Sequence, residues 1–318
     1  MLLIMIFSFI STKLLVSQQV TKCLAVITEI NGDVLFKKAN KSEFVKTFWG
    51  AQLYQGDQVK TSKESGVSLL FSNGNLIDLG SNSMITISKK SSSENETKKS
   101  VKNIGSELIA DFSILTLRRD DKGEIGALVG LRTVYIDRQV VLLSPYNTLI
   151  NTNLPSFSWF SKKSFDNFNV KLYNSNGLLW SKEISENKME YPGDEEELEY
   201  GESYFWHVEG EDLIDTYKSV NQGFSILSQE KSIEVGAQEK RIKDLFRDDP
   251  NSCSFHSVLG FYYIKKGLLE DAIKEFKMIS EINANAPLPH EILGKLYNDT
   301  GKKDMAIAEL QKALQLSK

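Results

Sequence analysis

Few residues in this chain are of the types that perform acid–base or metal chemistry. The three histidines are His207, His256 and His290. Cys253 and His256 are three residues apart, which places them on one face of a helix. A zinc site needs two further ligands, and none clusters with them in the sequence. The pattern favours structural histidines, with His207 on the outer face of a strand.

Two other segments have compositions that are found at ligand sites. The glycine-rich segment 120–130 lacks the Lys-Ser/Thr pair of a phosphate-binding loop. The acidic run Asp194–Glu197 is consecutive and lacks the alternating spacing of a calcium loop, so we expect a solvated loop. No catalytic, cofactor-binding or metal-binding residue is predicted, and the chain is expected not to be an enzyme.

Three tryptophans admit two interpretations. Trp159, Trp180 and Trp206 could form a platform on which sugar rings stack. A small β module also needs large buried side chains, and tryptophan often supplies them. We expect all three to lie in a core, and their burial would exclude the sugar platform.

The elements that must position these residues come from a chain of 318 residues, which is long enough for two or three domains. The net charge of −4 gives no electrostatic reason to expect nucleic acid or an anionic membrane as a partner.

The first residues are strongly apolar. The apolar stretch that begins at Met1 has about the length of a signal-peptide core and is short for a membrane span. Residues 1–22 are therefore predicted to be a signal peptide or an N-terminal anchor. Export to the periplasm or cell envelope is therefore expected, with membrane contact only through this segment. The alternative is a buried N-terminal strand or helix. Cys23 follows Lys22 rather than the small residue that lipid modification requires.

Residues 25–90 are predicted to form a β domain, because short apolar segments alternate with turns rich in Asn and Gly. The strands are expected at 26–30, 34–37, 67–71, 76–79 and 84–88. Residues 91–143 are predicted to hold an exposed polar loop, at 91–102, and additional strands at 112–117 and 133–143.

The segment that begins with ITEINGDVLF resembles the FecR domain family over about 65 residues. The matching positions are Gly32, Val34, Gly50, Leu53, Gly56, Asp57, Thr61, Gly74, Leu79 and Ser83. The resemblance implies a β-roll or sandwich outside the cytoplasm, which in some members relays iron-uptake signals. From the residues themselves, the glycines indicate positive φ before strands, and Asp57 is suited to capping a turn.

Residues 144–228 are predicted to form a seven-strand β-sandwich. Tyr204, Trp206 and Val208 alternate so as to face one way, and two strands flank the turn 174–177. The segment resembles immunoglobulin-like and fibronectin type III-like modules.

Residues 230–318 repeat with a period of 34. Gly260, Tyr263, Gly267 and Ala272 recur as Gly294, Tyr297, Gly301 and Ala306. Such a period is typical of stacked helix-turn-helix hairpins. The segment resembles tetratricopeptide repeats, and two and a half repeats are expected. Because so short an array is rarely stable alone, we expect it to dock on the sandwich or on another chain.

The overall fold class expected is therefore multidomain β plus α. The resemblance to tetratricopeptide repeats implies that the first helix of each hairpin lines a partner groove. The candidate positions are Phe261, Ile264, Lys265, Glu291, Lys295 and Asn298. Their mixed charge indicates a polar peptide as ligand. Packing of this face against the sandwich is an equal alternative.

The expected function is that of a non-enzymatic exported envelope protein. It would bind or scaffold protein or cell-wall partners, without a cofactor and without nucleic acid. Two alternatives remain open: a FecR-type transmembrane signalling regulator, and a protein that binds carbohydrate or peptidoglycan.

Overall fold

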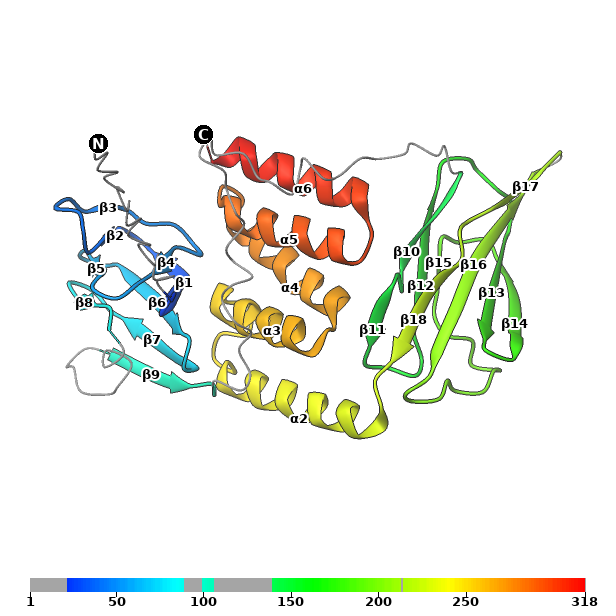
Figure 1. Ribbon diagram of the computed structural model, residues 1–318, viewed down its shortest axis with the longest axis horizontal. Coiled ribbons are helices and arrows are strands. Elements are labelled where there is room, and N and C mark those ends of the chain that lie inside the picture. The colour runs from blue at the N-terminus through cyan, green and yellow to red at the C-terminus, as the bar shows by residue number, and fades with distance from the viewer. Residues whose placement is uncertain (1–21, 89–98, 106–138, 213, 318) are drawn as a thin grey trace, which may run out of the picture.

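A row of helices lies between two β modules in the computed structural model of this protein (Figure 1). The structure describes residues 22–88, 99–105, 139–212 and 214–317. The predicted segment 1–22, the strand at 112–117 and the glycine-rich segment 120–130 fall wholly or almost wholly outside these ranges. The expectation of a multidomain fold of β modules and helices is confirmed.

The N-terminal β module consists of two antiparallel sheets. One has the strand order β4-β1-β6-β7-β9 and the other β3-β2-β5-β8. Their bounds are β1 Ala25–Asn31, β2 Val34–Lys37, β3 Val45–Lys46, β4 Gln52–Leu53, β5 Gln58–Thr61, β6 Gly66–Phe71, β7 Asn75–Leu79, β8 Met84–Thr86 and β9 Lys99–Asn103. A core that includes Ile27, Val59 and Leu69 lies within the module.

The turn at Gly32 passes the chain from one sheet to the other. β1 pairs with β4 and β6, whereas β2 pairs with β3 and β5. Gly32 has a φ of 72°, and a Cβ there would come 2.5 Å from the Oγ of Ser65. Glycine satisfies both the left-handed backbone and the close approach.

Polar residues among the positions that match the family pattern hold the backbone of this module. Buried Asp57 accepts hydrogen bonds from the backbone N–H of Ala39 and of Tyr54, at 2.9 and 3.0 Å. The hydroxyl of Thr61 donates to the carbonyl of Gly80 at 2.6 Å and accepts from the N–H of Ser83 at 2.9 Å. The capping role predicted for Asp57 is confirmed.

The structure differs from the prediction for residues 91–143 at both ends of this segment. Residues 99–103, at the end of the predicted polar loop and just beyond it, form β9, which pairs with β7 and adds an edge strand to the first sheet. Val101 packs against the core of the module, and Ile104 is fully buried. At the other end, β10 (Val140–Ser144) pairs with β12 and belongs to the second β module.

The middle β module contains two sheets that face each other across one core. The strand orders are β10-β12-β15 and β11-β18-β16-β13-β14, with β17 paired to β16. The remaining bounds are β11 Thr148–Ile150, β12 Phe157–Ser161, β13 Phe168–Asn174, β14 Gly177–Ile184, β15 Lys188–Met189, β16 Ser203–Glu211, β17 Thr216–Lys218 and β18 Gln222–Ile226. These are nine strands among the described residues, where seven were predicted, because short pairings such as β15 and β17 have little sequence signal.

The helical module follows directly. Its helices are α2 Gln229–Leu245, α3 Cys253–Lys266, α4 Leu269–Ile282, α5 Pro287–Asp299 and α6 Lys303–Leu316. α3 with α4 and α5 with α6 form the two predicted hairpins. Each first helix is followed by a glycine with positive φ, Gly267 and then Gly301.

Equivalent glycines also bring the two helices of each hairpin together. A Cβ on Gly260 would come 2.9 Å from the ring of Phe276, and one on Gly294 would come 2.6 Å from Leu310. The repeat thus places the smallest residue where a large apolar side chain of the second helix crosses the first.

The N-terminal β module and the helices share one apolar core. Val26, Leu70 and Ile104 lie in the same buried cluster as residues of α2 to α6. The middle module has a separate core.

Candidate interaction surface

The groove residues predicted on α3 become more exposed toward the end of the helix. Phe261 is fully buried, with its ring 5.4 Å edge-to-face from that of Phe276. Ile264 is half-buried, and Lys265 is exposed. Phe261 is therefore a core residue, whereas Lys265 is accessible to a partner.

The groove residues predicted on α5 follow the same order. Glu291 is 5% exposed, Lys295 is half-buried and Asn298 is exposed. The accessible part of the predicted groove is therefore confined to the C-terminal ends of the first helices.

Those helix ends lie beside the middle β module. Gly267, after α3, faces the side chain of Leu149 on β11, and Gly301, after α5, faces the ring of Tyr146. α3 and α5 point their C-terminal ends at this module and their N-terminal ends at the other, whereas α2, α4 and α6 run in the opposite direction (Figure 1). The expected docking of the helical array on the segment 144–228 is observed. The array also packs against the N-terminal β module, which was not predicted.

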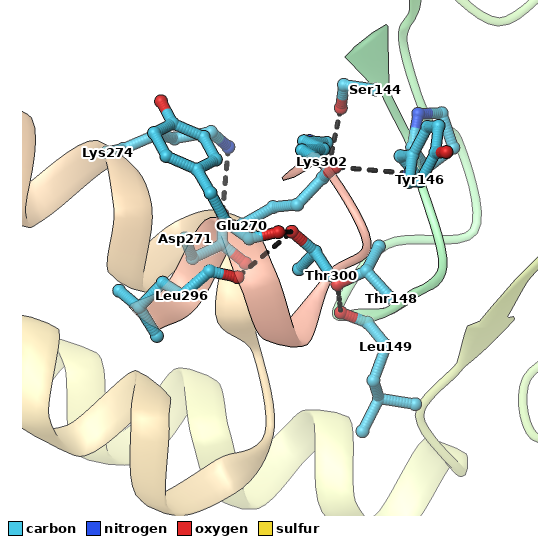
Figure 2. A network of polar contacts seen from close by, with 12 residues as sticks. Ser144, Tyr146, Thr148, Leu149, Glu270, Asp271, Lys274, Leu296, Thr300 and Lys302 are labelled. Carbon is cyan, nitrogen blue, oxygen red and sulfur yellow. Dashed lines mark hydrogen bonds and ion pairs between the residues drawn. The ribbon is translucent and has the colours of Figure 1, made fainter. Parts of the chain in front are cut away.

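A buried carboxylate lies at the centre of the junction with the middle module. Glu270, in the first turn of α4, accepts hydrogen bonds from the hydroxyl of Ser144 at 2.6 Å and the N–H of Tyr146 at 3.1 Å. The Nζ of Lys302 lies 2.8 Å from its Oε1 (Figure 2). The side chains of Glu270 and Lys302 are only 10% and 11% exposed. This pair therefore makes one charge-assisted cluster that joins both hairpins to the β module.

A groove of about 410 Å³ lies next to this cluster. It is open to solvent and is lined by outward residues of the larger sheet and by the turn after α3. The lining includes Leu149, Phe205, Gly223, Gly267 and Leu269, and no charged side chain contributes. Phe205 is half exposed there.

The opposite edge of the helices is fixed by the N-terminal β module. The hydroxyls of Thr28 and Ser254 lie 2.9 Å apart, and a carboxylate oxygen of Glu29 accepts from the N–H of Ser254 at 3.1 Å. Burial raises the pKa of the Glu29 carboxyl above its ordinary value, although the Ser254 N–H opposes this shift. The carboxylate therefore sits at the N-terminus of α3, where the helix dipole favours a negative charge.

Two of the histidines form equivalent pairs inside the hairpins. The Nδ1 of His256 lies 2.7 Å from Glu275, and the Nδ1 of His290 lies 2.6 Å from Glu309. His256 and Cys253 are both buried, and the Sγ of Cys253 accepts from the amide of Asn283 at 2.8 Å. Within the part of the chain that the structure describes, no three His, Cys, Asp or Glu residues are grouped so as to hold a metal ion.

His207 lies on the outer face of its strand, as predicted, but neighbouring side chains cover it. It alternates with Trp206 and Val208, so it faces away from the core, but it is only 2% exposed. Its ring stacks on Tyr173 at 5.4 Å, and its Nε2 lies 3.0 Å from a carboxylate oxygen of Glu209. Burial lowers the pKa of the imidazole, and the bond to Glu209 partly opposes this.

The burial of the three tryptophans excludes the platform for sugar rings that was one interpretation of them. Trp159, Trp180 and Trp206 are 2%, 5% and 0% exposed and lie in one core with Phe157. The prediction of carbohydrate binding through these three rings is therefore wrong, and the expectation that they lie in a core is confirmed.

The acidic run Asp194–Glu197 is partly neutralised by Lys182, which lies 2.8 Å from Asp194 and 2.6 Å from Glu195.

Helices that could cross a bilayer are not found among residues 22–88, 99–105, 139–212 and 214–317: none there combines the necessary length with the necessary apolar character. The predicted N-terminal segment lies outside these ranges.

Comparison with known proteins does not identify a family. No family model matches the chain, and no curated protein matches its sequence. Among solved structures, a multi-domain immunophilin from Arabidopsis thaliana has 12% identity and a TM-score of 0.20, covering 57% of this chain and 99% of its own. A beta-1,2-glucanase from Parabacteroides distasonis has 8% identity and a TM-score of 0.24, covering 93% of this chain and 58% of its own.

An alpha-L-rhamnosidase from Dictyoglumus thermophilum has 25% identity and a TM-score of 0.25. The match covers 31% of this chain, and the chain spans 13% of that enzyme's length. At these TM-scores, none of the three likenesses bears on the fold or the activity of this chain.

Proposed function

We propose that this chain is a non-enzymatic exported envelope protein that binds or scaffolds protein or cell-wall partners. In this proposal the N-terminal module is FecR-like, the middle module is immunoglobulin-like or fibronectin type III-like, and the hairpins are tetratricopeptide repeats. The repeat assignment is supported by contacts that recur from one hairpin to the next: Gly260 against Phe276, and Gly294 against Leu310.

The observation on which the binding role rests is the exposed corner at the C-terminal ends of α3 and α5. Lys265 and Asn298 are exposed there, and Lys295 is half-buried. Both helix ends adjoin the middle β module, so a partner at this corner would contact two modules at once. The two lysines favour a polar peptide with acidic side chains as ligand.

Reversal of the charge at this corner tests the binding role. Lys265→Glu with Lys295→Glu should abolish capture of acidic peptides selected on the wild-type protein from a displayed library. The matched control is Lys303→Glu with Lys312→Glu, which makes the same change in net charge at exposed positions of α6. Equal loss of capture in the control, or full capture by the first variant, would contradict a specific site at the corner.

Export is tested separately, by the mass of the N-terminus of the protein recovered from the cell envelope. Loss of about the first twenty residues would support a cleaved signal, in keeping with signal-peptide lengths. Recovery of the protein in the cytoplasmic fraction with its N-terminus intact would contradict export.

A further inference from the structure

The helical module is joined to its two neighbours in different ways. With the N-terminal β module it shares an apolar core, which contains Trp49, Leu70 and Leu76 together with residues of the helices. Leu288 on α5 lies so close to Gly50 that a Cβ there would overlap it. Separation of these two modules would expose core residues, so they behave as one rigid body.

The middle β module keeps its own core and adds little apolar surface to the junction. Leu149 of β11 is its one strand residue, among those described, that packs against the helical core, and it is only partly buried. The ring of Tyr146 also faces Gly301. The remaining contacts described there are polar: Ser144 and Tyr146 with Glu270, and Lys302 over the ring of Tyr146 at 5.6 Å. Such a junction can open with little exposure of either core.

The connection from β18 to α2 has the properties of a hinge. Ile226 is buried in the core of the middle module, Leu227 is buried in the helical core, and Ser228 caps α2. The N–H of Leu227 donates to the carbonyl of Ile150, and its carbonyl accepts from the N–H of Gly201, each at 3.0 Å. Leu227 therefore belongs to both bodies, and the chain can bend between it and the start of α2. Hinges of this kind are a few residues at the ends of elements. Residues 106–138, which also connect the bodies, lie outside the described residues.

We propose that the middle β module is a hinged body, held against the helical module by a latch made of Glu270, Lys302, Ser144 and the backbone N–H of Tyr146. The carboxylate and the ammonium are buried together, so each compensates the desolvation of the other. Loss of Glu270 leaves Lys302 without this carboxylate and Ser144 without its acceptor, which favours the open state. The neutral groove at the junction is lined by both bodies, so it exists only when the latch is closed.

The proposal is tested by a distance between the two bodies in the full chain. Spin labels are placed at Lys63→Cys, on the N-terminal β module, and Ser175→Cys, on the middle module; both positions are exposed. Cys23→Ser removes a partly exposed thiol. Cys253 is buried, and burial raises the pKa of its thiol to about 12, so it stays unlabelled near neutral pH.

The doubly labelled protein with Glu270 intact, called the background, should give one narrow distribution of distances between the two labels by double electron–electron resonance. Glu270→Ala should broaden it and add a population at a different distance. The matched control is Asp271→Asn, which also removes one carboxylate from the first turn of α4 but acts on an ion pair within that helix, with Lys274. It should leave the distribution narrow.

The latch is refuted if Glu270→Ala keeps the narrow distribution of the background, or if the background is already as broad as that variant. Circular dichroism checks that the helices and strands are retained. Should Glu270→Ala fail to fold, Ser144→Ala decides, because it removes one latch contact from the β side and leaves the ion pair intact. A narrow distribution in Ser144→Ala would then overturn the proposal, and a broadened one in a folded protein would support it.

Discussion

His256 and His290 occupy equivalent places in the two hairpins, and each has its Nδ1 beside a glutamate 19 residues further along. The 34-residue repeat aligns the two histidines, but their partners Glu275 and Glu309, which are also 34 residues apart, were not predicted. A search for recurring polar pairs, rather than recurring glycines and alanines, would have found them. At the scale of residues, a contact between a buried histidine and a glutamate therefore recurs in both hairpins, as the apolar packing does.

Glu309→Ala should destabilise the protein by about 1–3 kcal/mol, because the buried Nδ1 of His290 loses its partner. The free energy of unfolding from urea denaturation measures this. Glu281→Ala serves as the control, since Glu281 is an exposed glutamate on α4. It should change the stability by less than about 0.5 kcal/mol. Equal effects of the two variants would mean that the His–Glu pair contributes nothing.

At the scale of elements, a helix or strand could be predicted where the residues that determine it are close together in the sequence. The hairpin helices could be predicted because Gly260, Gly267 and their counterparts recur with small residues at fixed places. The strand Val34–Lys37 was predicted with its observed bounds. β9 was missed because its residues are mostly polar, and only pairing with β7 makes them a strand.

Glu270 was missed for a related reason. A glutamate in the first turn of a helix is common, because the helix dipole favours it there. Its burial depends on Ser144, Tyr146 and Lys302, of which the first two are more than a hundred residues away in the sequence. No local pattern contains this contact. The six predicted groove positions were affected in the same way, since the burial of Phe261 and Glu291 depends on tertiary packing.

Alanine at the helical glycines should have opposite effects in different helices. Gly260→Ala and Gly294→Ala force a Cβ against Phe276 and Leu310, and each should destabilise by about 1–3 kcal/mol. Gly236→Ala, in α2, meets nothing within 4 Å. It should stabilise by about 0.5–1 kcal/mol, because alanine is the better helix former. Thermal unfolding followed by circular dichroism gives the signs, and stabilisation by Gly294→Ala would contradict the packing described for the hairpins.

At the scale of the whole molecule, one of the three apolar clusters joins modules that are far apart in the sequence. The first and last modules share one apolar cluster, and the module between them in sequence has another. Trp49 belongs to the first cluster and Trp206 to the second, and both are almost fully buried.

Replacement of these two tryptophans by alanine should therefore destabilise different parts of the protein. Trp49→Ala should cost about 3–5 kcal/mol and lower the melting temperature of the helical signal in circular dichroism, although Trp49 lies in a β module. Trp206→Ala should destabilise the middle module by a similar amount and leave the helical melting temperature nearly unchanged. If the helical signal melted earlier in Trp206→Ala than in Trp49→Ala, the separation of the shared cluster from the core of the middle module would be wrong.

The shared core also determines when the protein can finish folding during its synthesis. Val26, Leu70 and Leu76 leave the ribosome early, but the helices that cover them are made only after the entire middle module. At roughly 5–20 residues per second, this apolar face waits on the order of ten seconds for its partner. During that interval the nascent chain presents a surface that a chaperone can occupy, and removal of the helices would leave the surface permanently uncovered.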